Sequence, residues 1–556
     1  MPKDRRGSGG THPARGDTAR SGGRLTSALQ WRVLPSPQRR TIIGVVAGGT
    51  GLAASSLIGA VIPNGQPLIT SVGDEVVSLT PAGVRQAAIG VLGTADKPVI
   101  LLSVGVLTLV IAGLLGLAAR HDRLPLALGG GVMIVIGLAA TIDSAPAAIP
   151  AAVLAAIGAV IAAAWTVERL SRPEPQGAPA RPERVRRTLH TPPRSWAEKE
   201  ITRRQFALLA AVVAGAAAVG QGIASLITSM SSTAVQAMRA TIHLPKVADP
   251  LPPVPAADSF NVPGLSPLVT ENDNFYRVDT EFVPPAVDVT TWNLTIQGMV
   301  RKPITLTYDQ LMKIPQVQAD ITLCCVSNDV GSDLISNARW QGVPLAKLLD
   351  MAGVLPGADQ VVGISVDGFS AGFPTQLALD GRMALVAVGM NGQPLPIDHG
   401  FPARLVVPGL YGYVSATKWL TEIQLTTLSS YDAYWVQRGW AQQGVIVTES
   451  RIDVPQGGAN VKAGSVIVAG VAWAQHRGIS AVQVRVDSGP WLDAQLAGEL
   501  SIDTWRQWRL AWQATAGTHT LEVRAADDTG TFQVSRFTYP FPGGATGYDQ
   551  IQVTVA

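Results

Sequence analysis

Five apolar stretches in the first 230 residues constrain this chain of 556 residues more than any other feature. Each is close to the roughly 20 residues that an α-helix needs to cross a bilayer, and none contains a charged residue. Charged residues make up only 15% of the chain, against about 25% in ordinary soluble proteins. We therefore predict five membrane-spanning helices, over Thr41–Ile62, Pro98–Ala119, Leu124–Ile142, Ala147–Val167 and Phe206–Ile227.

The basic residues between these stretches predict the orientation of the chain. Residues 1–40 hold nine Lys or Arg, and residues 168–204 hold ten Lys or Arg against five Glu. Residues 63–97 hold two basic and three acidic residues. Because cytoplasmic loops are enriched in Lys and Arg, five spans put the N-terminus in the cytoplasm and everything after the fifth span outside. We expect a multi-pass protein of a bacterial cell membrane.

Composition divides the chain into segments of different character. We expect a disordered basic arm in 1–40, four spans in 41–167, a basic cytoplasmic loop in 168–204, the fifth span in 205–228 and an extended Pro-rich linker in 229–260. Residues 261–428 mix β-type runs with helical patterns such as Tyr308–Lys313, which indicates an α+β domain. Residues 429–556 show alternating strands such as Ser465–Ala472, separated by Gly and Asp turns, which predicts an immunoglobulin-like β-sandwich. The predicted fold class is therefore multi-domain.

The only two cysteines are neighbours, Cys324 and Cys325. They cannot form an unstrained disulfide, because adjacent Cα atoms lie closer together than such a bond requires. The run Ile321-Thr-Leu-Cys-Cys-Val-Ser-Asn328 is typical of a strand that enters a loop, so the two side chains should point in opposite directions. One can face a core and the other a site, although both could instead be small buried apolar residues.

This stretch resembles the molybdopterin-binding domain of the sulfite oxidase family, which has a Thr-Leu-x-Cys-x-x-Asn segment. Cys325 and Asn328 match the cysteine and the asparagine of that segment. Further segments resemble the family in the same order along the chain, namely Asn272–Asp279, Ala338–Leu349, Asp398–Pro408 and Lys418-Trp419. The resemblance implies a molybdenum–molybdopterin cofactor, with the thiolate of Cys325 as the metal ligand and catalytic centre.

The resemblance also implies which side chains hold the cofactor. His399, Arg404 and Lys418 match the positions that bind it, where a terminal phosphate calls for cationic donors. The mouth of the cofactor site should be lined by Asn274, Phe275, Tyr276 and Arg277, and Arg277 should also border the substrate as a catalytic residue. Asp367 and Ser370 are further candidate pterin contacts, and Asn328 belongs to the cofactor-binding set.

The fifth span begins Thr202-Arg-Arg-Gln-Phe206, which is similar to a twin-arginine export signal. The alternative is that Arg203 and Arg204 only anchor the cytoplasmic end of the span. A domain that must acquire a pterin cofactor before export has to cross the membrane folded, which favours the export signal.

Departures from the family pattern bear on the substrate. Sulfite-oxidising members follow the asparagine with two arginines, whereas Asp329 and Val330 stand here, and an acidic group would repel a dianion. The active-site tyrosine of the family is replaced near Trp440. We therefore expect oxygen-atom transfer to a small, non-sulfite substrate. The alternatives are reduction of S- or N-oxides such as methionine sulfoxide, sulfite oxidation itself, and a non-catalytic binding module tethered to the membrane.

The sequence also predicts further cofactors and partners of the protein. It has no Cys-x-x-Cys-His motif and no histidine in any predicted span, so we expect no haem or iron–sulfur cluster in this chain. Electrons should pass to a separate cytochrome or quinone-linked subunit. The family resemblance suggests a homodimer through the C-terminal domain. A net charge of only +3 gives no indication of nucleic-acid binding.

Overall fold

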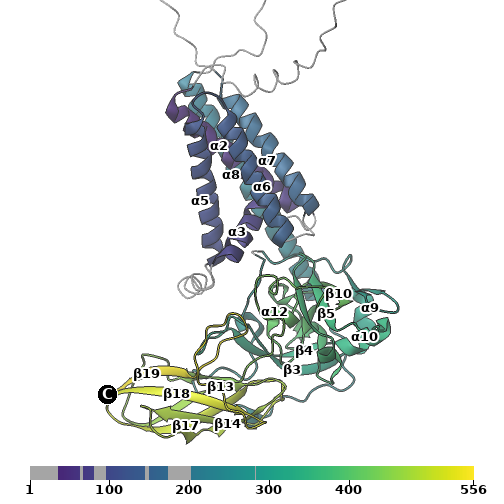
Figure 1. Ribbon diagram of the computed structural model, residues 1–556, viewed down its shortest axis with the longest axis vertical. Coiled ribbons are helices and arrows are strands. Elements are labelled where there is room, and N and C mark those ends of the chain that lie inside the picture. Colours follow the sequence, from purple (N-terminus) through teal and green to yellow (C-terminus); the bar gives the residue numbers. More distant parts are fainter. Residues whose placement is uncertain (1–34, 63–66, 81–95, 145–148, 173–201, 282) are drawn as a thin grey trace, which may run out of the picture. The chain divides into compact units, whose positions relative to one another are not determined.

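The computed structural model describes residues 35–62, 67–80, 96–144, 149–172, 202–281 and 283–556. Residues 1–34 of the basic arm predicted for 1–40, and most of the basic loop predicted for 168–204, lie outside these ranges. The described residues form two compact units, one of membrane-type helices and one that holds the rest of the chain from Ser225 (Figure 1).

Five helices are long and apolar enough to cross a membrane. They are α2 (Pro37–Val61), α5 (Asp96–Ala118), α6 (Leu124–Ser144), α7 (Ile149–Leu170) and α8 (Arg203–Thr241). Glycines allow α2 and α5 to approach closely, because a Cβ atom on Gly44 would lie 2.0 Å from the Ala112 carbonyl oxygen. The outer face of α5 is apolar and exposed, with Leu102 at 69% and Leu114 at 59%, as expected for a face that contacts lipid.

The helices of the structure differ from the predicted segments in three places. α2 begins at Pro37 rather than after residue 40, and its buried Arg39 donates a hydrogen bond to the Leu170 carbonyl at 3.2 Å. A helix that the sequence analysis missed, α3 (Leu68–Leu79), lies in the segment expected to be a loop. The linker predicted for 229–260 is helical up to Thr241, because α8 continues as one helix past the end of the predicted span.

The end of α8 is packed into the second unit rather than extended away from it. Val235 belongs to a core cluster of the catalytic domain. The Arg239 side chain donates hydrogen bonds to the Leu395 carbonyl at 2.7 Å and to the Pro394 carbonyl at 2.8 Å. These contacts stabilise the helical form of residues 229–241 more than their Ser/Thr-rich composition suggests.

One mixed sheet and one antiparallel sheet build the described part of the α+β domain, as predicted. The first has the order β2 (Ile304–Thr307), β1 (Asn293–Gly298), β10 (Leu420–Thr426), β5 (Gln360–Ser365) and β6 (Ser370–Pro374), with β1 parallel to β10. The second has the order β3 (Val317–Cys324), β4 (Ile335–Pro344), β7 (Leu385–Met390) and β8 (Gln393–Pro394), and β9 (Arg404–Val406) pairs with β7. Helices α9 (Tyr308–Lys313), α10 (Leu345–Ala352), α11 (Gln376–Leu379) and α12 (Gly412–Ser415) complete the domain.

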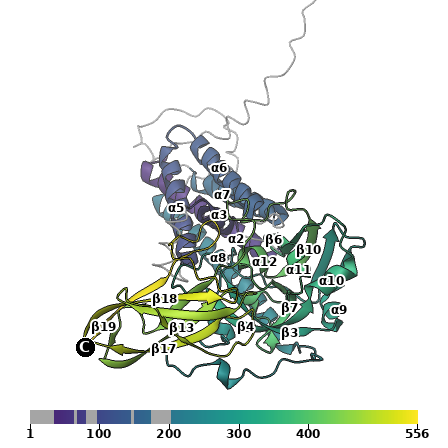
Figure 2. The ribbon, with the colours of Figure 1, turned by 60° about the horizontal axis from the view of Figure 1, so that its bottom comes forward.

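The C-terminal domain consists of two sheets around one apolar core, and its strands β13, β17, β18 and β19 are seen together in Figure 2. One sheet has the order β11 (Glu449–Val454), β13 (Gly464–Trp473), β17 (Arg506–Ala514) and β16 (Gln495–Leu496). The other has the order β12 (Asn460–Val461), β19 (Asp549–Val555), β18 (Gly517–Asp527), β14 (Ile479–Val486) and β15 (Leu492–Asp493). Two sheets over one core agree with the expected sandwich, and its immunoglobulin type stays a prediction.

Hydrogen bonds from the C-terminal domain hold β3, the strand that ends at Cys324. Thr322 of β3 accepts a hydrogen bond from the Trp505 amide at 2.8 Å, and its own amide donates to the Asp503 carbonyl at 3.0 Å. The Trp505 indole donates to the Leu268 carbonyl at 2.9 Å. Because these bonds are buried, they hold β3 in a fixed place relative to the second domain.

Candidate active site

The two cysteines at the end of β3 have different surroundings, as their alternation predicts. Cys324 is fully buried and packs in the larger core of the catalytic domain. Cys325 is 9% exposed, and its Sγ accepts a hydrogen bond from the Ser327 amide at 3.4 Å. Burial raises the pKa of the Cys325 thiol, while this hydrogen bond and the positive charge of Lys418 oppose that rise. Of the two sulfurs, that of Cys325 is therefore the one suited to a ligand role.

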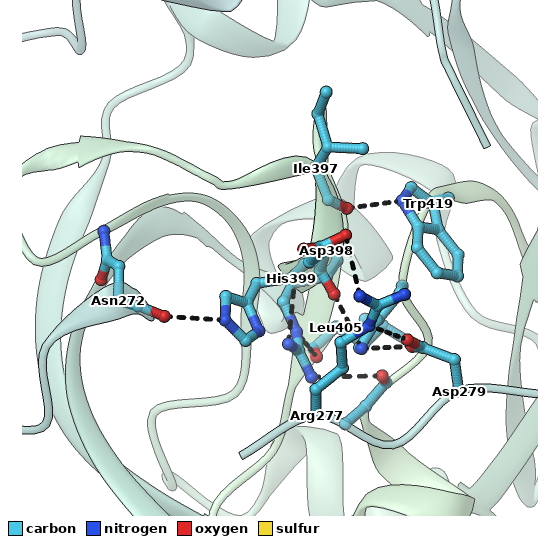
Figure 3. Close-up of polar contacts among 11 residues, drawn as sticks. Asn272, Arg277, Asp279, Ile397, Asp398, His399, Leu405 and Trp419 are labelled. Carbon is cyan, nitrogen blue, oxygen red and sulfur yellow. Dashed lines mark hydrogen bonds and ion pairs between the residues drawn. The ribbon is translucent and has the colours of Figure 1, made fainter. Parts of the chain in front are cut away.

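Four basic side chains lie close to one another, and we call Arg277, His399, Arg404 and Lys418 the cationic cluster; Figure 3 labels Arg277 and His399 of this set. Arg404 at the start of β9 is 3% exposed, and it donates to the carbonyls of His399, Leu405 and Ala416 at 3.1, 3.4 and 3.3 Å. Its guanidinium carbon lies 5.1 Å from the ring centroid of Trp340. Burial lowers the pKa of Arg404 to about 10. Its hydrogen bonds to the described residues all go to backbone carbonyls, so its charge is not matched by a bonded carboxylate.

One buried carboxylate, that of Asp279, holds the other two cations. Lys418 Nζ donates to Asp279 and to the Asp398 carbonyl at 2.8 Å, and Arg277 Nε donates to Asp279 at 2.7 Å. Arg277 also pairs with the half-exposed Asp398 carboxylate at 3.3 Å. Burial lowers the pKa of Lys418 to about 8, and the charges of Arg404 and Arg277 add to this effect. The sequence analysis missed Asp279, although it ends the quoted motif Asn272–Asp279.

His399 closes the cluster from the short helix η5 (Ile397–His399). Its Nε2 lies 3.0 Å from the Asn272 carbonyl oxygen, so this nitrogen carries the hydrogen and donates it (Figure 3). Nδ1 is buried without a hydrogen-bond partner among the described residues. Burial lowers the pKa of His399 to about 3, and the charges of Lys418 and Arg404 lower it further. An arriving anion would remove part of that repulsion.

Tyr276 connects the thiol to the cationic cluster. Burial raises its pKa well above the usual value, the neighbouring Cys325 and Cys324 raise it further, and Arg404 lowers it. The phenol is therefore close to both the sulfur and the guanidinium, and it stays protonated at physiological pH. A neutral hydroxyl there can donate a hydrogen bond into the site.

A second group of buried polar atoms lies under the loop that follows Cys325. Asn328 is 2% exposed, and neither atom of its amide has a hydrogen-bond partner among the described residues. The Glu449 carboxyl from β11 lies near the Asn328 amide, and this amide favours the charged form of the carboxyl. The two groups do not have the geometry of a complete hydrogen bond. Burial nevertheless raises the pKa of Glu449 to about 8, and Asp329 and Asp549 raise it further. The sequence analysis missed Glu449 because it belongs to the next domain.

The other predicted site residues lie in three kinds of place. Phe275 is 5% exposed and packs edge-on against Trp340 and His399, so it supports the site from the core rather than lining its mouth. Asn274 is exposed and bonds weakly to Glu271 at 3.5 Å. Asp367 accepts the Phe369 amide hydrogen at 2.9 Å in a turn, and burial raises its pKa. Ser370 accepts the Tyr434 amide hydrogen at 3.2 Å. These last two hydrogen bonds are local to the first sheet and its neighbouring loop, not to the cationic cluster.

Comparison with known proteins agrees with this geometry. A family model described as the oxidoreductase molybdopterin binding domain matches residues 281–435. The uncharacterized oxidoreductase YuiH of Bacillus subtilis is 34% identical over 174 residues, which cover 31% of this chain and 83% of that protein. Mitochondrial sulfite oxidase of Mus musculus is 31% identical over 299 residues, which cover 45% of this chain and 54% of that protein. The chain belongs to the sulfite oxidase family of molybdopterin-binding oxidoreductases.

The extent of the match limits what the family says about the whole chain. This chain spans between 54% and 61% of the length of the three rodent and human sulfite oxidases that it matches. A crystal structure of the sulfane dehydrogenase SoxCD from Paracoccus pantotrophus aligns with a TM-score of 0.47 and 23% identity, over 52% of this chain and 82% of that chain. The family model covers the site described above, from Glu281 to Trp435, except for the Asn272–Asp279 segment and Glu449.

Proposed function

We propose that this chain is a membrane-anchored, extracytoplasmic molybdenum–pterin oxidoreductase, which catalyses two-electron oxygen-atom transfer on a small, uncharged, non-sulfite substrate. One observation carries the proposal: the thiol of Cys325 lies within reach of the charge of Lys418 in the cationic cluster, in which the buried Arg404 bonds to no carboxylate among the described residues. A thiolate is a soft metal donor, and a buried cation without a bonded carboxylate suits an anionic ligand.

The residues present fit the cofactor. Arg404 and Lys418 would hold its phosphate. The unpartnered Nδ1 of His399 carries no hydrogen, so it would accept a hydrogen bond from an N–H group of the pterin. Cys325 would supply the thiolate to the metal. When bound, the cofactor supplies a metal centre that exchanges an oxygen atom and an electron pair with the substrate.

The chain's own residues favour an uncharged substrate. Arg277 would border the substrate, and its charge is already matched by Asp279 and Asp398. Tyr276 would orient the substrate through its neutral hydroxyl. Asp329 stands where the sulfite-oxidising pattern has an arginine, so a dianion would meet one acidic group and lack one basic group.

The proposed location rests on the helices and the charges. Five helices among the described residues are long and apolar enough to span a membrane. The last of them, α8, begins with Arg203 and Arg204, and Thr202 and Gln205 exchange reciprocal hydrogen bonds at 2.9 and 3.2 Å that cap its start. We propose that these arginines form an export signal, and that the catalytic domain lies outside the cytoplasm.

Metal analysis and turnover of the purified full chain test the function. We expect about one molybdenum atom per chain, as one thiolate ligand implies. We also expect slow oxidation of sulfite with ferricyanide as acceptor, and faster turnover of an uncharged substrate such as methionine sulfoxide with a reduced dye. A chain without molybdenum would indicate a binding module, and rapid turnover of sulfite would contradict the argument from Asp329. The Cys325→Ser variant is the matched control, because it keeps the cationic cluster and loses the soft ligand.

A further inference from the structure

Four exposed aromatic rings lie on the segment between β18 and β19, and three of them follow one another at every second residue, after Phe532. Phe537, Tyr539 and Phe541 are 53%, 68% and 47% exposed, and we call them the aromatic patch. The ring centroids of Phe537 and Tyr539 are 5.1 Å apart, so these two form one surface. Soluble domains rarely expose neighbouring large rings without a partner that covers them.

A chain of ring contacts leads from the aromatic patch toward the site. Phe541 contacts the buried Trp440 with centroids 5.3 Å apart, and Trp440 contacts Tyr413 at 5.9 Å. Gly412 is the residue before Tyr413 in α12. A Cβ atom added to Gly412 would lie 3.8 Å from both the Tyr276 hydroxyl oxygen and the Cys324 carbonyl oxygen. Packed side chains and backbone therefore join the patch to the residues around Cys325.

The patch segment is held by backbone hydrogen bonds within the C-terminal domain, and it lies close to Tyr411 of the catalytic domain. The Ala441 amide donates to the Pro542 carbonyl at 2.9 Å, and the Gly544 amide donates to the Pro540 carbonyl at 2.7 Å. Gly544 has a φ of +110°, and a Cβ there would lie 2.4 Å from the Tyr411 hydroxyl oxygen. Because these contacts fix the segment, Phe541 keeps its place on Trp440.

We propose that the aromatic patch is the docking surface for a one-electron carrier protein, which exchanges electrons with the site through the Phe541–Trp440–Tyr413 contacts. This inference rests on the proposed function. Oxidation of one substrate molecule with one water yields the oxygenated product, two protons and two electrons. The two electrons leave singly, so two carrier molecules are each reduced by one electron, and the protons pass to water.

The surface fits such a partner in size and charge. Electron-transfer complexes have small interfaces, and aromatic residues are enriched at the centre of protein–protein interfaces. Arg536 is the one charged residue between positions 529 and 548, and it is exposed. A carrier with acidic residues around the exposed edge of its cofactor would complement it. The ring contacts toward the site favour a redox partner over lipid or a second copy of the chain.

Two electron acceptors of different size test the docking surface on the full-length holoenzyme in lipid nanodiscs. Ferricyanide is small enough to need no docking surface, whereas an acidic c-type cytochrome needs one. For the double variant Phe537→Ser with Tyr539→Ser, we expect kcat/KM for the cytochrome to fall by about tenfold or more, which matches the loss of interface rings. Turnover with ferricyanide should stay within about twofold of the wild type. The Leu492→Ser variant removes an equally exposed apolar side chain on β15 and should change neither rate.

Each other outcome contradicts part of the reasoning. Unchanged cytochrome kinetics in the double variant, or a wild type that reduces ferricyanide but not the cytochrome, would overturn the docking surface. Quenching of a Tyr539→Trp variant by brominated lipid would show that the patch contacts the membrane instead. A dimer that the double variant abolishes would show that a second copy covers it. With sulfite as the electron donor, a wild type that reduces neither acceptor although it reduces methionine sulfoxide would overturn the docking surface alone. A wild type that turns over none of these substrates contradicts the proposed function, and the docking surface with it.

Discussion

Replacing Glu449 by Gln should stabilise the protein, by an amount that grows with pH. Glu449 is 3% exposed in β11, and its Oε1 has no hydrogen-bond partner among the described residues. Burial raises its pKa to about 8, and Asp329 and Asp549 add to this rise. Gln has nearly the same shape and no charge, so the variant isolates the effect of ionisation.

The size of the effect follows from the difference in pKa between the folded and unfolded chain. The unfolded carboxyl releases its proton near pH 4.5, whereas the folded one holds it to about pH 8. Since the folded state binds the extra proton, this group's stabilisation is complete below pH 4.5 and is lost as the pH rises toward 8. The loss is about 1.4 kcal/mol per pH unit, or about 3 kcal/mol at pH 7. The Gln variant does not suffer this loss.

Thermal unfolding of the purified full chain between pH 5 and pH 8 measures this difference. We expect the melting temperatures of the wild type and Glu449→Gln to be close at pH 5 and to differ by roughly 5 °C at pH 7. Glu499→Gln, at an exposed position of the same domain, should show no such growth. A difference that stays constant or shrinks as the pH rises would refute the argument that Glu449 is protonated in the fold.

Three further predictions concern the thiol, the cationic cluster and the export signal. Cys325→Ser should lose molybdenum and activity. Cys324→Ser should keep both, and its free energy of unfolding should fall by about 1–2 kcal/mol through lost packing. Equal loss of metal in the two variants would refute the assignment of the ligand. Inorganic phosphate should raise the melting temperature of the cofactor-free protein at pH 7. This effect should be lost above about pH 8, because Lys418 gives up its proton there, and the Lys418→Met variant should lack this pH dependence. Changing Arg203 and Arg204 to Lys should leave the amount of protein unchanged but keep the catalytic domain in the cytoplasm. Protease added outside spheroplasts should then cleave the wild-type domain and not that of the double variant. Equal cleavage of the two would indicate that the arginines only anchor the helix by their charge.

The sequence predicted those parts of the fold whose signals are local. The helix over Tyr308–Lys313 is found at those residues, because Thr307 and Gln310 form a capping box at its start. The strand expected over Ser465–Ala472 extends one residue further at each end, from Gly464 to Trp473. Local chemistry also separated Cys324 from Cys325, since alternate side chains of a strand point in opposite directions.

What the sequence did not predict depends on contacts between distant residues. α8 continues through a Ser- and Thr-rich segment because Val235 and Arg239 pack on the catalytic domain, about 150 residues further along the chain. The role of Asp279 is visible only once Lys418, which lies 139 residues away in sequence, is placed beside it. The buried acid Glu449 has no local signal either, since a single Glu in a strand is usually exposed.

These long-range contacts change how the domain boundary near residue 429 should be understood. The C-terminal domain places Glu449 under the loop that follows Cys325, and it bonds Trp505 to β3. It also packs Phe541 on Trp440, a buried ring that contacts Tyr413 of the catalytic domain. The environment of the Cys325 thiol is therefore built by both domains. Since the surface that we propose for the electron carrier also belongs to the C-terminal domain, changes there should alter electron exchange without any change in the residues that hold the cofactor.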